Sequence, residues 1–340
     1  MKSILKILIV VSAVVLMICP ISCNVSEHGL VLLDTITEDS FCSPQLQSYT
    51  VTGDKSIRLV FNEKINLMDY GITPAMSISD INVDNSNNGG AAFYDIILNE
   101  NMNIGEQYKL YGVVEDKIGN TLTFSIPFTG YNNQVPDLQI SEVHPKYSSS
   151  KTAAGTTYRC EFIEIVARSN GNLSGVKICS ANDGEGKEFI LPAVQVKEND
   201  IIIVHLRNKT FALSELDEKT DSSISRYSSS NARDLWNEND SARLGDDMDI
   251  ITIENPFNGK IIDALCYGNS KYENWKTDFL KAMAEKVVNA GLWESSDYSK
   301  SVKSDEITPT KSIIRIGTGH SASDWKISKT NGETPGIIEY

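Results

Sequence analysis

Short segments in which apolar and polar residues alternate are the feature that most constrains the fold of this chain. Within residues 56–63, Ile57, Leu59 and Phe61 alternate with polar residues, as in a strand that buries one face. Comparable segments follow at 76–83, 93–98, 108–114 and 121–128, and Gly, Asn and Asp separate them. Several short strands joined by tight turns predict a β-sandwich.

A second series of strands begins after residues 131–137, which contain Pro136 and two Asn residues and are expected to form a linker. Strands are predicted at 138–143, 161–166 and 200–206, followed by a hairpin over 249–267. The chain is long enough for two modest domains. The sequence therefore predicts an all-β protein with two Ig-like β-sandwich domains in tandem.

The N-terminal residues indicate export. Lys2 and Lys6 precede an apolar run from Ile7 to Ile18, which is shorter than the roughly 20 residues needed to span a membrane. Residues 1–22 are therefore predicted to be a signal peptide. Its removal would change the net charge from −14 to −16, because it carries two lysines and no acidic residue. So acidic a chain would repel phosphate backbones, and no nucleic-acid partner is expected.

The residues around Cys23 resemble the lipobox of bacterial lipoproteins, in the looser form typical of spirochaetes. A small residue, Ser22, precedes the cysteine, although Pro20 stands where the family usually has Leu. The resemblance implies that acyl chains such as palmitate are attached to Cys23, that residues 23–44 form a tether, and that the protein is held at the cell envelope. We expect the outer membrane or the cell surface rather than the inner membrane. Ordinary cleavage and release is the alternative.

Two further resemblances concern the folded regions. Residues 45–131 resemble bacterial Ig-like modules of the SbsA or Big_5 type, through the opening strand S-I-R-L-V-F-N-E at 56–63 and the ending at 108–120, where a Tyr strand leads into D-x-x-G-N. Gly119 and Asn120 can take the positive φ of a tight turn. Residues 138–340 resemble the lamin tail domain, an Ig-like sandwich. The motifs occur in the family's order: I-S-E-V at 140–143, E-F-I-E-I at 161–165, L-S-G at 173–175, F-I-L-P at 189–192, the hairpin at 245–267, S-I-I-R at 312–315, D-W at 324–325 and T-P-G at 334–336.

Two insertions enlarge the second domain. The first, 208–244, is rich in Ser, Asp and Asn and is expected to be a mobile or lightly structured loop. The second, 269–309, contains a predicted helix over 274–290, in which Trp275, Phe279, Met283 and Val287 recur every fourth residue. This stripe is expected to pack on the sandwich; a groove helix for a partner is the alternative.

Cysteine and acidic residues offer few sites. Export permits a disulfide, and Cys160 and Cys179 are a possible pair, although buried thiols are as good an interpretation. Asp246, Asp247 and Asp249 are candidates for a calcium site, which Asp263 could join. Because Asp246 and Asp263 match the lamin tail hairpin, turn formation is preferred. No metal and no cofactor are predicted.

Catalytic groups are scarce in the sequence. His28, His144, His205 and His320 each stand alone in a strand or loop, where histidine is usually structural. Glu142 and Glu164 fall on neighbouring predicted strands and could act as an acid and base pair. Both positions belong to the lamin tail signature, so a structural hydrogen-bonding role is preferred.

The sequence therefore favours a non-enzymatic, lipid-anchored envelope protein that displays its sandwiches to bind or adhere to an unidentified protein or glycan. The alternative is an exported metal-dependent phosphoesterase or a protein associated with a nuclease, because bacterial lamin tail domains often accompany such enzymes.

Overall fold

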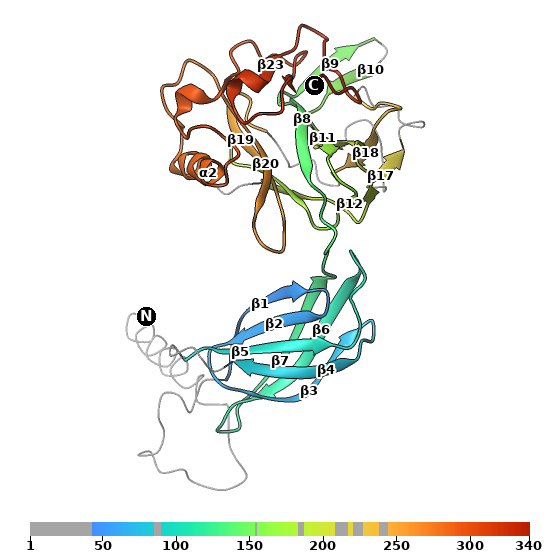
Figure 1. Cartoon of the computed structure of the whole chain (residues 1–340), viewed down its shortest axis with the longest axis vertical. Coiled ribbons are helices and arrows are strands. Elements are labelled where there is room, and N and C mark those ends of the chain that lie inside the picture. Colours follow the sequence, from blue (N-terminus) through green and yellow to red (C-terminus); the bar gives the residue numbers. More distant parts are fainter. Residues whose placement is uncertain are drawn as a thin grey trace, which may run out of the picture.

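The computed structural model describes residues 43–84, 90–153, 155–182, 187–207, 217–219, 227–237 and 244–340. Within these ranges the chain forms β-strands in several sheets, one α-helix and short 3-10 helices. Figure 1 shows the strands gathered into two bodies that a linker joins. The prediction of an all-β chain with two sandwiches in tandem and a helix in the second is confirmed. The expected signal peptide, Cys23, His28 and most of the tether lie outside the described residues.

The first sandwich consists of a four-stranded sheet, in the order β1-β2-β5-β4, and a three-stranded sheet, in the order β3-β6-β7. Every pair of neighbouring strands is antiparallel. The strands are β1 (Leu46–Gly53), β2 (Ser56–Phe61), β3 (Asn66–Thr73), β4 (Ile78–Asp84), β5 (Ala92–Leu98), β6 (Gln107–Glu115) and β7 (Thr121–Thr129).

Phe61 joins the two sheets of the first sandwich. Its side chain, at the end of β2, is fully buried. The ring lies edge-on to Tyr94 of β5 at 5.8 Å between centroids, and to Phe124 of β7 in the other sheet at 6.1 Å. Edge-to-face pairs of this kind stabilise a core beyond the area they bury. The alternation that predicted β2 from the sequence therefore directs its apolar residues into this core.

The predicted turn between β6 and β7 is built around Asp116. One carboxylate oxygen of Asp116 accepts hydrogen bonds from the backbone N–H groups of Ile118 (2.8 Å) and Asn120 (2.9 Å). Gly119 takes the positive φ of +95° that the sequence predicted for it. Asn120 is not among the residues of positive φ; its side chain instead donates to Asp116.

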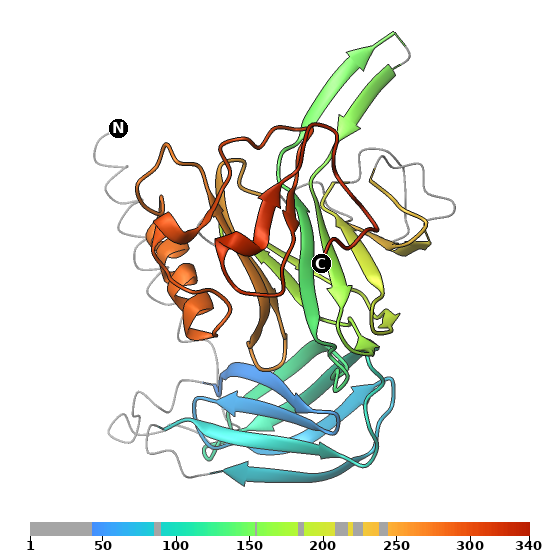
Figure 2. The same cartoon turned by 45° about the horizontal axis from the view of Figure 1, so that its top comes forward.

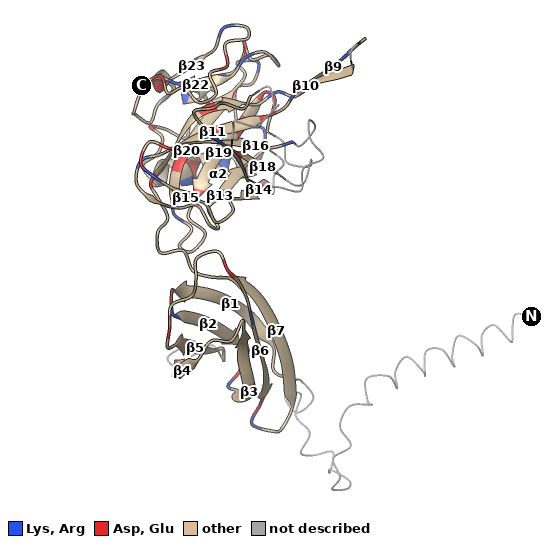
Figure 3. Ribbon diagram, turned by 90° about the vertical axis from the view of Figure 1, so that its right-hand side faces the viewer, with Lys and Arg blue, Asp and Glu red and all other residues tan. Residues whose placement is uncertain are grey.

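The second sandwich packs a seven-stranded sheet, in the order β17-β18-β16-β11-β8-β22-β23, against a five-stranded sheet, in the order β14-β13-β19-β20-β21. Two strand pairs, β12-β15 and β9-β10, flank them. Figures 2 and 3 show β9 and β10 projecting from this sandwich at the end away from the first. The strands are β8 (Leu138–His144), β9 (Ser148–Thr152), β10 (Gly155–Arg159), β11 (Phe162–Ala167), β12 (Gly171–Asn172), β13 (Lys177–Ser180), β14 (Lys187–Ile190), β15 (Gln195–Val196), β16 (Ile201–His205), β17 (Asp217–Lys219), β18 (Arg233–Trp236), β19 (Met248–Glu254), β20 (Ile261–Gly268), β21 (Val302–Lys303), β22 (Ile313–Arg315) and β23 (Trp325–Ile327), with 3-10 turns η5 (Tyr298–Lys300) and η6 (Ala322–Asp324).

Helix α2 (Asp278–Asn289) packs on the second sandwich. It starts later than predicted, because Thr277 caps it by accepting a hydrogen bond from the Leu280 N–H at 3.1 Å. Its buried residues, Leu280, Ala284 and Val287, belong to the same core cluster as the two large sheets. Gly291, at a φ of +75°, follows its last turn. Of the predicted stripe, Val287 is buried, and Trp275, Phe279 and Met283 are partly buried against the same core. The helix therefore packs on the sandwich, as the sequence analysis preferred.

The first insertion contributes two strands, β17 and β18, to the seven-stranded sheet, which corrects the expectation of a lightly structured loop. Strand β18 pairs in parallel with β16, and Leu235 joins the main core. Tyr227 is buried and packs with Phe162 and Ile203 on the other face of the same sheet. The sequence signal was the apolar and aromatic content of residues 227 to 236 inside an otherwise polar insertion.

The linker lies along the second sandwich. The side-chain amide of Asn132, which is 2% exposed, donates to the carbonyls of Asn172 (2.6 Å) and Ser174 (3.0 Å). The ring of Tyr131 contacts that of Phe257, 4.3 Å between centroids. The second sandwich therefore holds the linker that follows the first sandwich.

We expect Phe61→Ala to lower the free energy of unfolding of the first sandwich by about 3–5 kcal/mol, because a buried aromatic side chain would leave a cavity between the sheets. Urea unfolding of the whole chain measures this loss. Phe93→Ala is the control, since Phe93 points to the other face of β5 and is only half-buried. Equal losses in the two variants would show that Phe61 does not join the sheets.

Candidate functional site

Glu142 and Glu164 are buried on the face of the seven-stranded sheet that points away from the main core. They lie opposite each other in β8 and β11 and are 1% and 0% exposed. Successive side chains of a strand point to opposite faces, and the neighbours of Glu164, Ile163 and Ile165, belong to the main core. The two carboxylates therefore face the other way, toward whatever covers the outer side of the sheet.

The C-terminal segment covers them. Glu142 accepts hydrogen bonds from the backbone N–H (3.0 Å) and the hydroxyl (2.9 Å) of Thr334. Glu164 accepts from the backbone N–H of Gly336 at 2.6 Å. Figure 2 shows this segment running over β8 and β11. The two glutamates thus bind the T-P-G segment, which was part of the lamin tail resemblance.

Serine hydroxyls also donate hydrogen bonds to the two glutamates. Ser312 donates to Glu142, and Ser141 donates to Glu164 at 2.7 Å. Burial raises the pKa of Glu142 to about 7 and that of Glu164 to about 8, while the donated hydrogen bonds oppose the shift. Because their oxygens are engaged by residues of this chain, the structure supports the hydrogen-bonding interpretation over an acid and base pair.

Three of the four aspartates of the acidic hairpin have partners within this chain. Asp249 is buried and accepts hydrogen bonds from the Ser180 hydroxyl (2.6 Å) and from three backbone N–H groups. Asp247 pairs with Lys271 and Lys146, whereas Asp246 is exposed. Asp263 pairs with Arg315 at 2.7 Å and accepts the Ile140 N–H. Within the described ranges no three His, Cys, Asp or Glu side chains are grouped so that they could hold a metal, and these partners favour the structural role that the sequence analysis preferred.

Cys160 and Cys179 are not joined by a disulfide, which corrects the possible pairing. Cys160 directly precedes β11 in the seven-stranded sheet, and Cys179 lies in β13 of the five-stranded sheet. Packed sheets lie about 10 Å apart, whereas a disulfide needs Cα atoms within about 7 Å. Burial raises the pKa of the Cys179 thiol to about 11, as expected of a buried, unreactive cysteine.

The two strand histidines have structural partners that the sequence did not reveal. His205 lies 2.6 Å from a carboxylate oxygen of Asp234 and stacks on Trp236, and both partners come from β18. His144 stacks on Phe162 and contacts Tyr227. Burial lowers the pKa of His144 to about 4, so it is neutral at physiological pH. His320 is exposed in a loop. Asp234, Trp236 and Tyr227 lie in the insertion, whose strands the sequence analysis missed.

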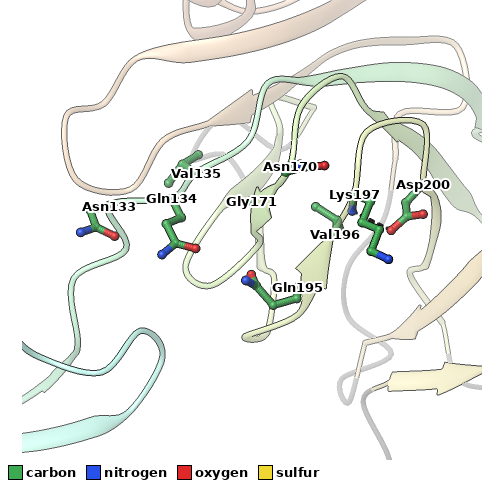
Figure 4. Close-up of a pocket in the computed structure, with 9 residues that line it drawn as sticks. All are labelled: Asn133, Gln134, Val135, Asn170, Gly171, Gln195, Val196, Lys197 and Asp200. Carbon is green, nitrogen blue, oxygen red and sulfur yellow. Dashed lines mark hydrogen bonds between the residues drawn. The ribbon is translucent and has the colours of Figure 1, made fainter.

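A groove with a mixed polar and apolar lining lies where the linker meets the second sandwich. Its volume is about 690 Å³, and its lining includes the linker residue Gln134, the β15 residue Gln195 and the turn residue Lys197. Figure 4 shows these side chains around the groove. The sequence analysis treated residues 131–137 only as a linker and missed this site, because its walls come from segments some 60 residues apart.

This combination of features defines a tandem β-sandwich protein whose second sandwich is closed by its own C-terminal segment. Residues 136–327, more than half of the chain, match a family model described as TP_1001_2nd, a protein second domain, and the chain belongs to this family.

The curated and solved proteins that resemble the chain are distant. An uncharacterized protein of Treponema pallidum (strain Nichols) is 28% identical over 256 residues, covering 70% of this chain and 62% of that protein. The chain thus spans less than two thirds of this relative. The N-terminal part of the bacterial S-layer protein SbsC is 14% identical, with a TM-score of 0.26, and the match covers 38% of this chain and 42% of that structure. A DUF4876 family protein from Bacteroides thetaiotaomicron is 12% identical, with a TM-score of 0.22, over 62% and 75% of the two chains.

We expect Glu164→Gln to change how stability depends on pH. A glutamate whose pKa is raised in the folded state stabilises the fold below its ordinary value of about 4.5, and this contribution is lost as the pH rises through about 8. The glutamine of the variant does not ionise, so the variant does not lose this contribution. Its free energy of unfolding relative to that of the natural chain should therefore increase as the pH rises between these values, by at most about 1.4 kcal/mol per pH unit.

Chemical unfolding at a series of pH values tests this prediction. Glu198→Gln is the matched control, because Glu198 is exposed, and its pH dependence should follow that of the natural chain. A constant difference between Glu164→Gln and the natural chain would show that Glu164 is not protonated in the fold over this range.

Proposed function

We propose that this chain is a non-enzymatic envelope protein, anchored by a lipid on Cys23, that displays two β-sandwiches for binding a protein or glycan. The anchor would sit at the outer membrane or the cell surface. The proposal includes the relationship of the first sandwich to the SbsA or Big_5 modules and that of the second sandwich to the lamin tail domain. It also includes the signal peptide at residues 1–22.

The observation that carries the proposal is the use made of the buried carboxylates. Glu142 and Glu164 are the candidates for an acid and base pair, and both instead accept backbone hydrogen bonds from the C-terminal segment, at Thr334 and Gly336. Asp249 and Asp263 likewise serve a turn and an arginine. These polar groups shape and rigidify a scaffold, as a display protein requires.

The order of the chain supports the same function. The proposed anchor precedes the first sandwich, and the second sandwich follows the linker, so the first would act as a spacer between membrane and display domain. Figure 3 shows the two sandwiches end to end. The excess of acidic residues, 45 against 31 basic ones, favours solubility of this body. Among the described residues, no helix has the length and apolarity to cross a bilayer.

Replacing the proposed lipid site tests the anchor. We expect Cys23→Ser to move the protein from the membrane fraction to the soluble fraction and to abolish labelling with palmitate, because several acyl chains hold a protein stably at a bilayer. Cys42→Ser is the matched control and should leave both properties unchanged. Membrane retention of Cys23→Ser without loss of acyl mass would contradict the proposal.

The enzymatic alternative is tested separately. We expect the purified chain to leave a phosphodiester substrate intact with magnesium, manganese or calcium, because its buried carboxylates bind the C-terminal segment. Metal-dependent hydrolysis that disappears in Glu142→Gln, while the fold is retained by circular dichroism, would replace the display function with a hydrolase.

A further inference from the structure

We propose that the groove between the linker and β15 binds a short neutral saccharide. This inference deepens the proposed display function, on which it rests, because it names the site and the chemical class of the ligand. The proposed site consists of residues of the linker and of the second sandwich.

The linker wall of the groove is fixed in place. The carbonyl of Gln134 accepts the N–H of Asn172 at 2.7 Å. Gly171 lies so close that a Cβ atom there would stand 2.3 Å from the same carbonyl and 2.9 Å from the ring of Pro136. Only a glycine permits this approach. Together with the buried amide of Asn132, these contacts hold the backbone of the linker against the sandwich.

The opposite wall is equally well defined. Strand β15 pairs with β12, with Gln195 opposite Asn172. In the turn that follows, the carboxylate of Asp200 accepts the N–H of Lys197 at 2.8 Å. The side-chain oxygen of Asn170 accepts the N–H of Glu198 at 2.9 Å. Binding sites are usually largely pre-formed, and both walls of this groove are held by hydrogen bonds of the chain itself.

Two side-chain amides face the space between these walls. Figure 4 shows the amides of Gln134 and Gln195 on opposite sides of it. Both residues are exposed, and neither amide has a hydrogen bond recorded within the described ranges. The half-buried Val135 adds apolar surface beside them, whereas Val196 is 5% exposed and belongs to the main core. The groove thus combines polar groups that are available to a ligand with the exposed part of one valine.

This set of groups fits a hydroxyl-rich ligand. A carboxamide donates through its NH₂ and accepts through its oxygen, and a sugar hydroxyl likewise donates and accepts. The C–H groups of a sugar ring can lie on the exposed part of Val135. A volume of about 690 Å³ falls within the range of small-ligand sites.

Charge in the groove argues for a neutral ligand. Lys197 and Asp200 contribute one charge of each sign. The chain as a whole has a net charge of −14 and repels anions at a distance. A phosphate or a polyanionic glycan would therefore find neither a cationic cluster at the site nor a favourable field around it.

Saturation-transfer NMR with the full chain in detergent tests the inference, with maltotriose, cellotriose and chitotriose as the probes. We expect at least one of these trisaccharides to bind, and the double variant Gln134→Ala, Gln195→Ala to bind it at least tenfold more weakly. Gln47→Ala is the matched control, because it removes an exposed glutamine of β1 and should leave affinity unchanged. Both variants should melt at the temperature of the natural chain, since the altered side chains are exposed.

Three results would overturn the inference: no binding of any probe, equal binding by the double variant, or binding of inorganic phosphate in place of the sugars. Membrane retention of the same protein, measured beside its Cys23→Ser variant, separates this failure from that of the proposed function. A chain that stays anchored but binds no sugar refutes the groove alone, whereas a chain that is not anchored refutes the display function.

Discussion

The second sandwich depends on two carboxylates that it buries on the outer face of its larger sheet. Removing a carboxylate from water costs several kcal/mol, and hydrogen bonds to charged groups return about 1.5–3 kcal/mol each. Glu142 and Glu164 receive such bonds from the backbone at Thr334 and Gly336. Because burial raises the pKa of both groups, these hydrogen bonds matter for the protonated carboxyl groups as well as for the charged ones. The C-terminal segment and the sheet are therefore interdependent: the segment supplies donors, and the sheet supplies acceptors for them away from water.

This arrangement makes the two sandwiches different in kind. The first follows simple alternation, with apolar residues such as Leu59 inward and polar residues outward. In the second, strand β11 is buried on both faces, from Phe162 to Ala167. Its inner face meets the five-stranded sheet, and its outer face meets the C-terminal segment and Tyr227. Burying both faces requires polar residues with assigned partners, which explains why Glu142, His144 and Glu164 stand among apolar residues.

The limits of sequence reasoning follow from the same geometry. Local patterns of apolar residues predicted the central strands of both sandwiches and α2, but not β1 or β3 of the first sandwich. The partners of Glu142 and Glu164 lie more than 170 residues away, and β18 pairs in parallel with β16 across an insertion. The sequence analysis preferred turn formation over calcium binding for the acidic hairpin, but it did not predict the distant partners of these residues. Asp249 accepts a hydrogen bond from Ser180 of β13, and Asp263 pairs with Arg315 of β22. The sequence shows that acidic residues cluster there, whereas the tertiary fold determines which donors they bind.

The linker illustrates how one segment can serve two purposes in such a fold. Two of its groups hold it to the second sandwich, namely the backbone carbonyl of Gln134 and the buried side-chain amide of Asn132. Its exposed side chains are left to face the groove. A ligand that bridges Gln134 and Gln195 would add contacts between the linker and β15 without changing the fold of either, because both walls are already fixed. Binding at this position therefore needs no rearrangement of the linker, because the hydrogen bonds that hold it are made by the chain alone.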